Sequence, residues 1–180
     1  LNGVTAVEVT APAGTEVQWA GFEIAWVAAT SEEIARDAIK KIKVSYEVLP
    51  HFVREEDPTK ATGRTKPAGE QVTGDPDKAF AAAEVISEGE YGTPVVTHCT
   101  FEPHGQTIQW KGEQIEYWPT TQALSDIGGD LARQLKIPAT QVHAQMDYMG
   151  GGFGSKFPSD KWGVTAAKLS KASGGRPVKL

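Results

Sequence analysis

A glycine-rich segment is the part of this sequence whose residue types most clearly suggest chemistry: Met149-Gly150-Gly151-Gly152-Phe153-Gly154-Ser155-Lys156-Phe157. The alternating run 142–148 before it predicts a strand, and the residues from Pro158 onward predict a helix. A strand, a glycine loop and a helix in this order allow backbone N–H groups to approach an anion, because glycine has no Cβ to block the approach. From the glycines alone, a phosphate- or cofactor-contacting turn and a tight packing bend are equally good interpretations.

Two common nucleotide motifs do not match this segment. A P-loop ends in Gly-Lys-Ser/Thr, whereas here Lys156 precedes Phe157. The dinucleotide fingerprint needs a glycine at the position of Ser155 and a later acidic residue where the sequence has Ala172-Ser173-Gly174. An ordinary nucleotide-binding loop is therefore disfavoured.

A second group of reactive side chains comprises His98, Glu102 and His104. These residues lie on a predicted loop that enters a hairpin, and they lack the helical i, i+4 spacing of a zinc site. Zinc is therefore disfavoured, and from the residues alone Glu102 is interpreted as a carboxylate that shapes a turn. No nucleophile–base triad is recognisable.

Four elements in order resemble the molybdenum-binding subunit of the molybdenum hydroxylases, the xanthine dehydrogenase and aldehyde oxidase family. The segment from His98 to Pro103 resembles the family's His-x-x-x-Glu element, and Trp118-Pro119-Thr120-Thr121-Gln122 resembles its Ser/Thr-Thr-Gln element. The stretch 131–138 and then the glycine loop follow in the family's order. One such element is weak evidence, but four in order are strong evidence.

The resemblance implies an α+β chain that is a fragment of a longer large subunit. Residues 1–52 would be the second half of an α/β hammerhead-like domain, 53–75 a linker, and 76–180 the N-terminal part of a mixed α+β molybdopterin-binding domain. The first half of the hammerhead and the later pterin-binding loops have no counterpart, and both ends look cut. The general base of the family also has no counterpart in this sequence. We therefore expect no catalytic residue in this fragment and no activity from it alone.

The implied cofactor is molybdenum–molybdopterin, with the cytosine dinucleotide form as one variant. In the family the metal is ligated by the pterin dithiolene and by oxo, sulfido and hydroxo groups, so no side chain here would ligate it directly. Gln122 would approach the oxo ligand through its amide, which donates a hydrogen bond without competing as an anion; an exposed strand-end glutamine is the alternative. The remaining cofactor-binding residues would be Gly151, Gly152, Phe153 and Gly154, with His98 and Glu102 supporting the loop.

Phe157 is the residue that bears on the substrate. Purine-hydroxylating members carry a glutamate there, and phenylalanine cannot hydrogen-bond a purine edge. We therefore expect an aldehyde or an N-heteroaromatic substrate, oxidised at a C–H bond with water as the oxygen source, as in aldehyde-type or isoquinoline-oxidoreductase-like members. Ser155, where the commonest loop has glycine, is a mild departure that aldehyde-type members share.

The implied partners are the remainder of the large subunit, modules or subunits carrying 2Fe-2S and FAD, or a cytochrome subunit, and a small-molecule substrate. A net charge of −5 without a basic cluster disfavours nucleic acid, and no apolar run has the length of a membrane span. One cysteine excludes an internal disulfide, and the compartment stays open between cytoplasm and periplasm. The alternative hypothesis is a non-catalytic α+β binding domain whose glycine loop contacts an anion or a partner strand.

The elements that position these residues can be predicted from periodicity. In the first part we expect strands at 4–9 and 23–29, a capping box from Thr30 to Glu33, a helix at 32–42 and a closing strand at 44–48. Ile39 belongs to the apolar stripe expected to dock that helix on the strands. In the second part we expect a helix at 77–84, a strand at 85–91, a hairpin with strands at 107–110 and 114–118, and a helix ending before Pro138.

Overall fold

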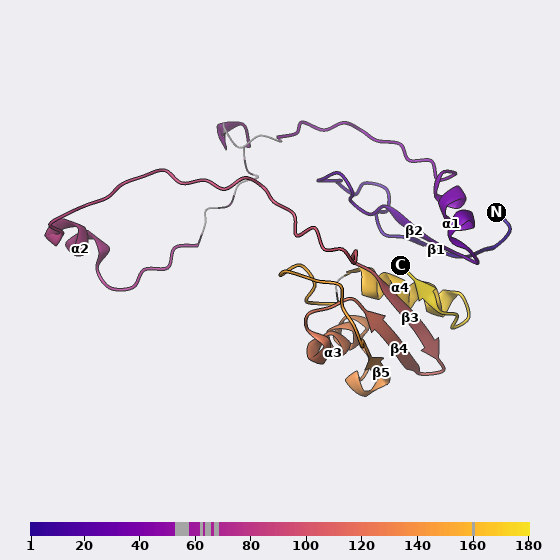
Figure 1. The fold of residues 1–180 in the computed structure, drawn as a ribbon. Helices are drawn as coiled ribbons and strands as arrows, with labels where there is room; N and C mark the ends of the chain where they lie inside the picture. The colour runs from indigo at the N-terminus through magenta and orange to yellow at the C-terminus, as the bar shows by residue number, and fades with distance from the viewer. Residues whose placement is uncertain (53–57, 62, 64–65, 67–68, 160) are drawn as a thin grey trace. The chain divides into compact units, whose positions relative to one another are not determined.

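The computed structural model describes residues 1–52, 58–61, 63, 66, 69–159 and 161–180. The chain forms two units, one of residues 1–43 with 96–180 and the other of residues 44–95. Figure 1 shows the ribbon of both units. The domain boundaries at 52 and 76 stay predictions, and part of the predicted linker lies outside the described residues.

A four-stranded sheet of order β5-β4-β3-β6 is the frame of the first unit. Figure 1 labels three of these strands, β5, β4 and β3. β3 (Gln106–Lys111) and β4 (Gln114–Pro119) pair antiparallel. Between them, Gly112 adopts the positive φ of 63° that the two-residue turn requires. β5 (Val142–Ala144) runs parallel to β4, and β6 (Val178–Lys179) runs antiparallel to β3. The hairpin prediction is confirmed.

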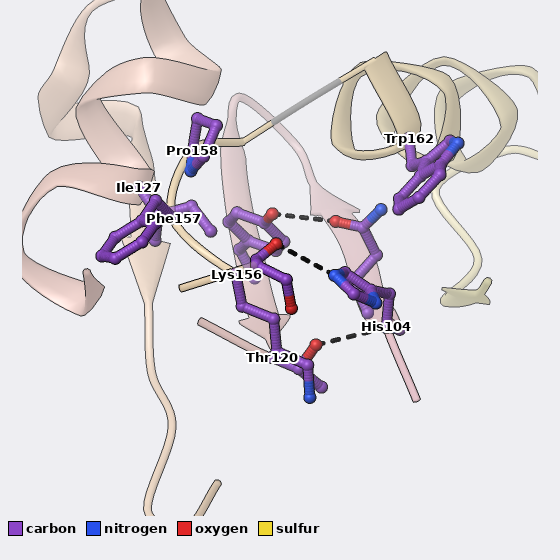
Figure 2. Close-up of a pocket in the computed structure, with 11 residues that line it drawn as sticks. His104, Thr120, Ile127, Lys156, Phe157, Pro158 and Trp162 are labelled. Atoms are coloured by element: carbon purple, nitrogen blue, oxygen red, sulfur yellow. Dashed lines mark hydrogen bonds between the residues drawn. The ribbon is translucent and has the colours of Figure 1, made fainter. Parts of the chain in front are cut away.

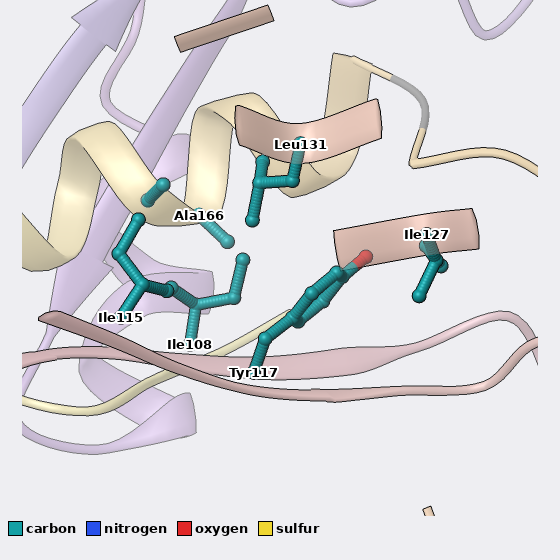
Figure 3. Packing of buried hydrophobic residues seen from close by; sticks show 7 residues of the cluster. Ile108, Ile115, Tyr117, Ile127, Leu131 and Ala166 are labelled. Atoms are coloured by element: carbon teal, nitrogen blue, oxygen red, sulfur yellow. The ribbon is translucent and has the colours of Figure 1, made fainter. Parts of the chain in front are cut away.

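One face of this sheet packs against α3 (Leu124–Leu135) and α4 (Lys161–Ala172). Figure 3 shows the side chains of the two strands directed at the two helices. The predicted four-residue spacing of α3 places Ile127 and Leu131 in this core. The helix ends where Lys136 adopts a left-handed conformation, two residues before Pro138. The buried residues of the cluster are Ile108, Ile115, Tyr117, Ile127, Leu131, Ala166 and Ala167.

The N-terminal segment forms a second layer against α4. β1 (Val4–Val9) pairs antiparallel with β2 (Ala25–Ala29), and Ala6 and Ala28 bury against Leu169 of α4. α1 (Glu32–Ile39) follows β2. Its N-cap is Ser31, whose hydroxyl accepts a hydrogen bond from the Ile34 N–H at 3.4 Å. The predicted cap at Thr30 is therefore wrong by one residue, because the helix starts at Glu32.

The predicted closing strand at 44–48 is wrong, and so is the expected burial of Ile39. Residues 44–48 are exposed and form no strand, and Ile39 is 51% exposed. Alternation fixes which side chains share a face, but a strand also needs a hydrogen-bonded neighbour. No described segment supplies that neighbour, so the stripe of α1 buries only Ala38.

The unit of residues 44–95 contains the short 3₁₀ helix η1 (Pro58–Ala61) and α2 (Pro76–Ala82). The Asp75 carboxylate caps α2 by accepting a hydrogen bond from the Lys78 N–H at 3.1 Å, and Pro76 occupies the first turn. The helix prediction is confirmed. The strand predicted at 85–91 is wrong, since this segment is extended, exposed and without a ladder partner among the described residues. None of the described helices combines the length and the apolar character needed to cross a membrane.

Candidate cofactor-binding site

The glycine loop leaves the sheet earlier than its alternating sequence predicts. β5 covers only Val142–Ala144, after which the Gln145 N–H still donates to the Tyr117 carbonyl at 2.9 Å. Tyr148, which the alternation places on the same face as Val142 and Ala144, is 93% exposed. The backbone then has positive φ at Gly151 (95°), Phe153 (51°) and Gly154 (97°). Glycine allows this conformation at positions 151 and 154, whereas Phe153 adopts the left-handed region that side chains disfavour.

Gln122, on the turn after β4, holds this loop through hydrogen bonds from both its backbone and its side chain. Its backbone N–H donates to the Lys156 carbonyl at 2.6 Å, and its Oε1 accepts from the Gly154 N–H at 2.8 Å and the Lys156 N–H at 3.5 Å. A backbone N–H can only donate, so the amide oxygen must face the loop. The Nε2 group then points away, and no described residue accepts a hydrogen bond from it.

Two glycines are required because another residue lies too close. A Cβ on Gly152 would lie 2.4 Å from Gln122 Oε1, and a Cβ on Gly150 would lie 2.4 Å from Glu102 Cβ. Carbon atoms do not approach other atoms that closely without displacing them. The loop backbone is thus held directly against Gln122 on one side and Glu102 on the other.

Glu102 supports the start of the loop through its carboxylate. Its Oε2 accepts from the Gly150 N–H at 2.8 Å. Lys156, only 3% exposed, donates to the Glu102 carbonyl at 2.7 Å, and its Nζ lies 3.5 Å from Oε2. A buried ammonium group is tolerated when it is paired and hydrogen-bonded in this way. Sequence reasoning missed Lys156, because its partner is 54 positions away and no local pattern marks the pair.

Thr121 fixes the other end of the loop and was also missed. Its buried hydroxyl donates to the Phe157 carbonyl at 3.1 Å and accepts from the Ala123 N–H at 3.0 Å. His98 lies beside Gly154, where an added Cβ would come within 3.8 Å of the imidazole Nε2. The elements predicted to meet at the loop, around residues 98–102, 120–122 and 150–157, are therefore brought together.

A small open pocket of about 40 Å³ is lined by residues 155–158 together with His104, Tyr117 and Trp162. Figure 2 shows His104 reaching the loop from one wall and Phe157 lying beside Ile127 on the other. His104 Nε2 lies 3.0 Å from the Ser155 carbonyl, which can only accept, so this nitrogen carries the proton. The Tyr117 hydroxyl donates to Gln106 Oε1 at 2.8 Å at the base of the pocket.

The site presents hydrogen-bond donors and backbone without side chains. It does not present a set of metal ligands among the described residues. Within the described ranges no three His, Cys, Asp or Glu side chains converge on one point. Gly151 and Gly152 present backbone without side chains, and Gln122 presents a free amide donor beside them. These features fit a group that brings its own metal ligands and its own acceptor atoms, as a molybdopterin cofactor does.

The family comparison agrees with this geometry. Residues 55–180 match the family model described as molybdopterin cofactor-binding domain. The chain belongs to this family, that of the molybdenum hydroxylases. The predicted family and the predicted α+β fold class are thereby confirmed.

Among curated proteins, the chain is 36% identical over 107 residues to the aldehyde oxidoreductase molybdenum-binding subunit PaoC of Escherichia coli K12, covering 59% of this chain and 14% of PaoC. It is 30% identical over 166 residues to mouse xanthine dehydrogenase/oxidase, covering 91% of this chain and 12% of the enzyme. The chain thus spans about one seventh or less of these relatives.

Among solved structures, the CO dehydrogenase from Oligotropha carboxidovorans superimposes with a TM-score of 0.78 at 26% identity, over 99% of this chain and 28% of that one. Quinoline 2-oxidoreductase from Pseudomonas putida 86, at 23% identity and a TM-score of 0.70 over 99% of this chain and 27% of that one, shares the fold.

Proposed function

We propose that in the intact protein this chain forms part of the molybdopterin site of a molybdenum-dependent oxidoreductase. The observation that carries the proposal is the orientation of Gln122, whose Oε1 is held by the Gly154 and Lys156 N–H groups. That arrangement leaves Nε2 as an oriented donor directed away from the loop backbone. When bound, the cofactor would supply a two-electron redox centre that inserts a water-derived oxygen into a substrate C–H bond.

The residues of this chain would bind and orient the cofactor. Gly151 and Gly152 would let the loop backbone come close to the cofactor, because neither carries a side chain. The exposed ring of Phe153 would cover the cofactor from one side. Gln122 Nε2 would donate to an acceptor atom of the cofactor. A fixed donor in a water-excluded site typically stabilises charge that develops during reaction by a few kcal/mol.

The substrate proposed for the intact protein is an aldehyde or an N-heteroaromatic compound. Phe157 stands where a purine-binding member would place a carboxylate, and a phenyl ring offers neither a donor nor an acceptor to a purine edge. The similarity to PaoC, named as an aldehyde oxidoreductase, favours the aldehyde class. Xanthine dehydrogenase is similar over more of the chain, so the choice depends on Phe157.

The chain alone would not turn over substrate. Glu102 is the carboxylate that contacts the glycine loop, and it is engaged by the Gly150 N–H and Lys156. It is therefore a poor general base. The base, and the 2Fe-2S and flavin or cytochrome centres that remove electrons, would belong to other parts of the intact protein or to its partner subunits. The cofactor proposed for the intact protein is molybdopterin, with the cytosine dinucleotide as one form.

Elemental and pterin analysis of the purified intact protein tests this function. We expect about one molybdenum and one pterin per copy, with release of cytidine monophosphate on acid hydrolysis if the dinucleotide form is present. Stoichiometric zinc or flavin without molybdenum would contradict the proposal. Oxidation assays with an aromatic aldehyde, quinoline and hypoxanthine would then rank the substrate classes, and a preference for hypoxanthine would refute the assignment made from Phe157.

A further inference from the structure

The loop that joins β1 to β2, residues 10–24, contacts the first turn of α4. Glu23 accepts hydrogen bonds from Trp162 Nε1 at 2.8 Å and from the Lys161 ammonium group. The Lys161 Nζ also lies 5.6 Å from the ring centroid of Trp19 and 5.7 Å from that of Phe22. The Glu23 side chain is 17% exposed, and the bond from Lys161, followed by that from Trp162, lowers the pKa of its carboxyl group. This contact joins residues 139 positions apart.

Trp162 continues this contact toward the glycine loop. Its indole ring packs edge-on against the His104 ring, with centroids 5.8 Å apart and planes at 76°. Figure 2 shows the two rings together at one wall of the pocket, with His104 directed at the loop. His104 Nε2 donates to the Ser155 carbonyl at 3.0 Å. The N–H of the same peptide group, which belongs to Lys156, lies 3.5 Å from Gln122 Oε1.

We propose that Glu23 is a positioning residue for the glycine loop. By fixing the indole plane of Trp162 it holds His104 in edge-to-face contact, and His104 in turn holds the peptide group that lies between it and Gln122. Edge-to-face aromatic pairs depend on ring orientation, so loss of the bond from Trp162 Nε1 to Glu23 weakens the support that the indole gives to His104. This role in ordering the loop does not depend on a bound cofactor. Only an effect of Glu23 on cofactor retention would rest on the proposed function.

Amide hydrogen exchange of Gly154, Ser155 and Lys156 in the intact protein tests the inference. Glu23→Ala and Trp162→Phe should each accelerate exchange at these amides by roughly two- to tenfold, the range expected for weakening one aromatic contact. Glu23→Gln should exchange as the unmodified protein does, because its amide oxygen still accepts from Trp162 Nε1. That rescue would separate a positioning role from a general effect of the ion pair.

Two matched controls also contact α4. Glu8→Ala removes another ion pair between the N-terminal strands and α4, the 2.8 Å contact with Lys168. Trp110→Phe removes another indole N–H donor, the one bonded to the Ala167 carbonyl at 2.9 Å. Neither change touches His104. Both variants should leave the exchange of Gly154, Ser155 and Lys156 unchanged.

A double variant tests the route through His104. If Glu23 acts through that ring, Glu23→Ala combined with His104→Ala should exchange no faster than His104→Ala alone, because coupled residues are not additive. Additive effects, failure of Glu23→Gln to rescue, or equal effects of Glu8→Ala would overturn the inference. Molybdenum content is measured in parallel. If the Glu23→Ala and Trp162→Phe variants show the predicted faster exchange but the protein contains no molybdenum, only the proposed function is refuted. If the protein contains molybdenum but these variants exchange at the unmodified rate, only the inference is refuted.

Discussion

Gly152 and Gln122 occupy adjoining space with no room for another atom between them. A Cβ on Gly152 would lie 2.4 Å from Gln122 Oε1 and 2.5 Å from Cδ. The glycine is thus required by the glutamine, and not by its own backbone angles, since its φ is not in the left-handed region. Any side chain at position 152 must move the amide whose orientation defines the candidate site.

Gly152→Ala should therefore impair cofactor retention while leaving the fold intact. The added methyl group collides with the Gln122 side chain, so it pushes the loop backbone, which the proposed function places against the cofactor, out of position. We expect a clear drop in molybdenum content by elemental analysis, with a small change in thermal midpoint. Gly129→Ala is the matched control, since it faces open space within α3 and alanine favours a helix by about 1 kcal/mol. Full molybdenum loading of Gly152→Ala would contradict the assignment.

Gln122→Ala should leave the intact protein folded and loaded with molybdenum but reduce its turnover. The side chain is exposed and contributes little to the core. Loss of one oriented donor predicts a fall in turnover of roughly ten- to a thousandfold. Steady-state kinetics and a thermal melt check both parts, with exposed Gln114→Ala as control. A fully active, molybdenum-containing Gln122→Ala protein would show that the role assigned to this residue is wrong.

Ile39→Ala and Leu131→Ala should differ sharply in stability. Ile39 is 51% exposed, so its truncation should cost less than about 0.5 kcal/mol. Leu131 is completely buried among Ile108, Ile115 and Ala166, and its truncation should cost about 2–5 kcal/mol. Denaturant unfolding of both variants measures this difference. A large loss for Ile39→Ala in the isolated chain would mean that α1 is packed differently.

Acid should weaken the contact between the N-terminal layer and α4 through Glu23. The folded-state pKa of its carboxyl group is lowered from the ordinary value of 4.5 by Lys161 and Trp162. A lowered pKa contributes stability that is present above the unfolded value and is lost as pH falls through the folded value. The free energy of unfolding should thus decline below about pH 4.5, and Glu23→Gln should flatten this part of the profile. Identical profiles for both proteins would exclude Glu23 as a contributor.

The sequence by itself determined the elements whose signals are local. The spacing of Ile127 and Leu131 with the stop at Pro138 defines α3, and the turn at Gly112 defines the hairpin. The glycine loop stands out by its residue types, and Gln122 was singled out by the resemblance of residues 118–122 to the Ser/Thr-Thr-Gln element of the family. Such signals need no knowledge of distant partners, since the period of a helix or the φ of a turn is set within a few residues.

Tertiary structure decided everything that depends on a distant partner. The alternating segments 44–48 and 85–91 satisfy the pattern of a strand, but among the described residues they have no neighbour to complete their hydrogen bonds. The burial of Lys156 against Glu102 and the bond from Trp162 to Glu23 join residues 54 and 139 positions apart. A buried charge is stable only beside its partner, and sequence spacing does not encode which partner the fold will bring to it.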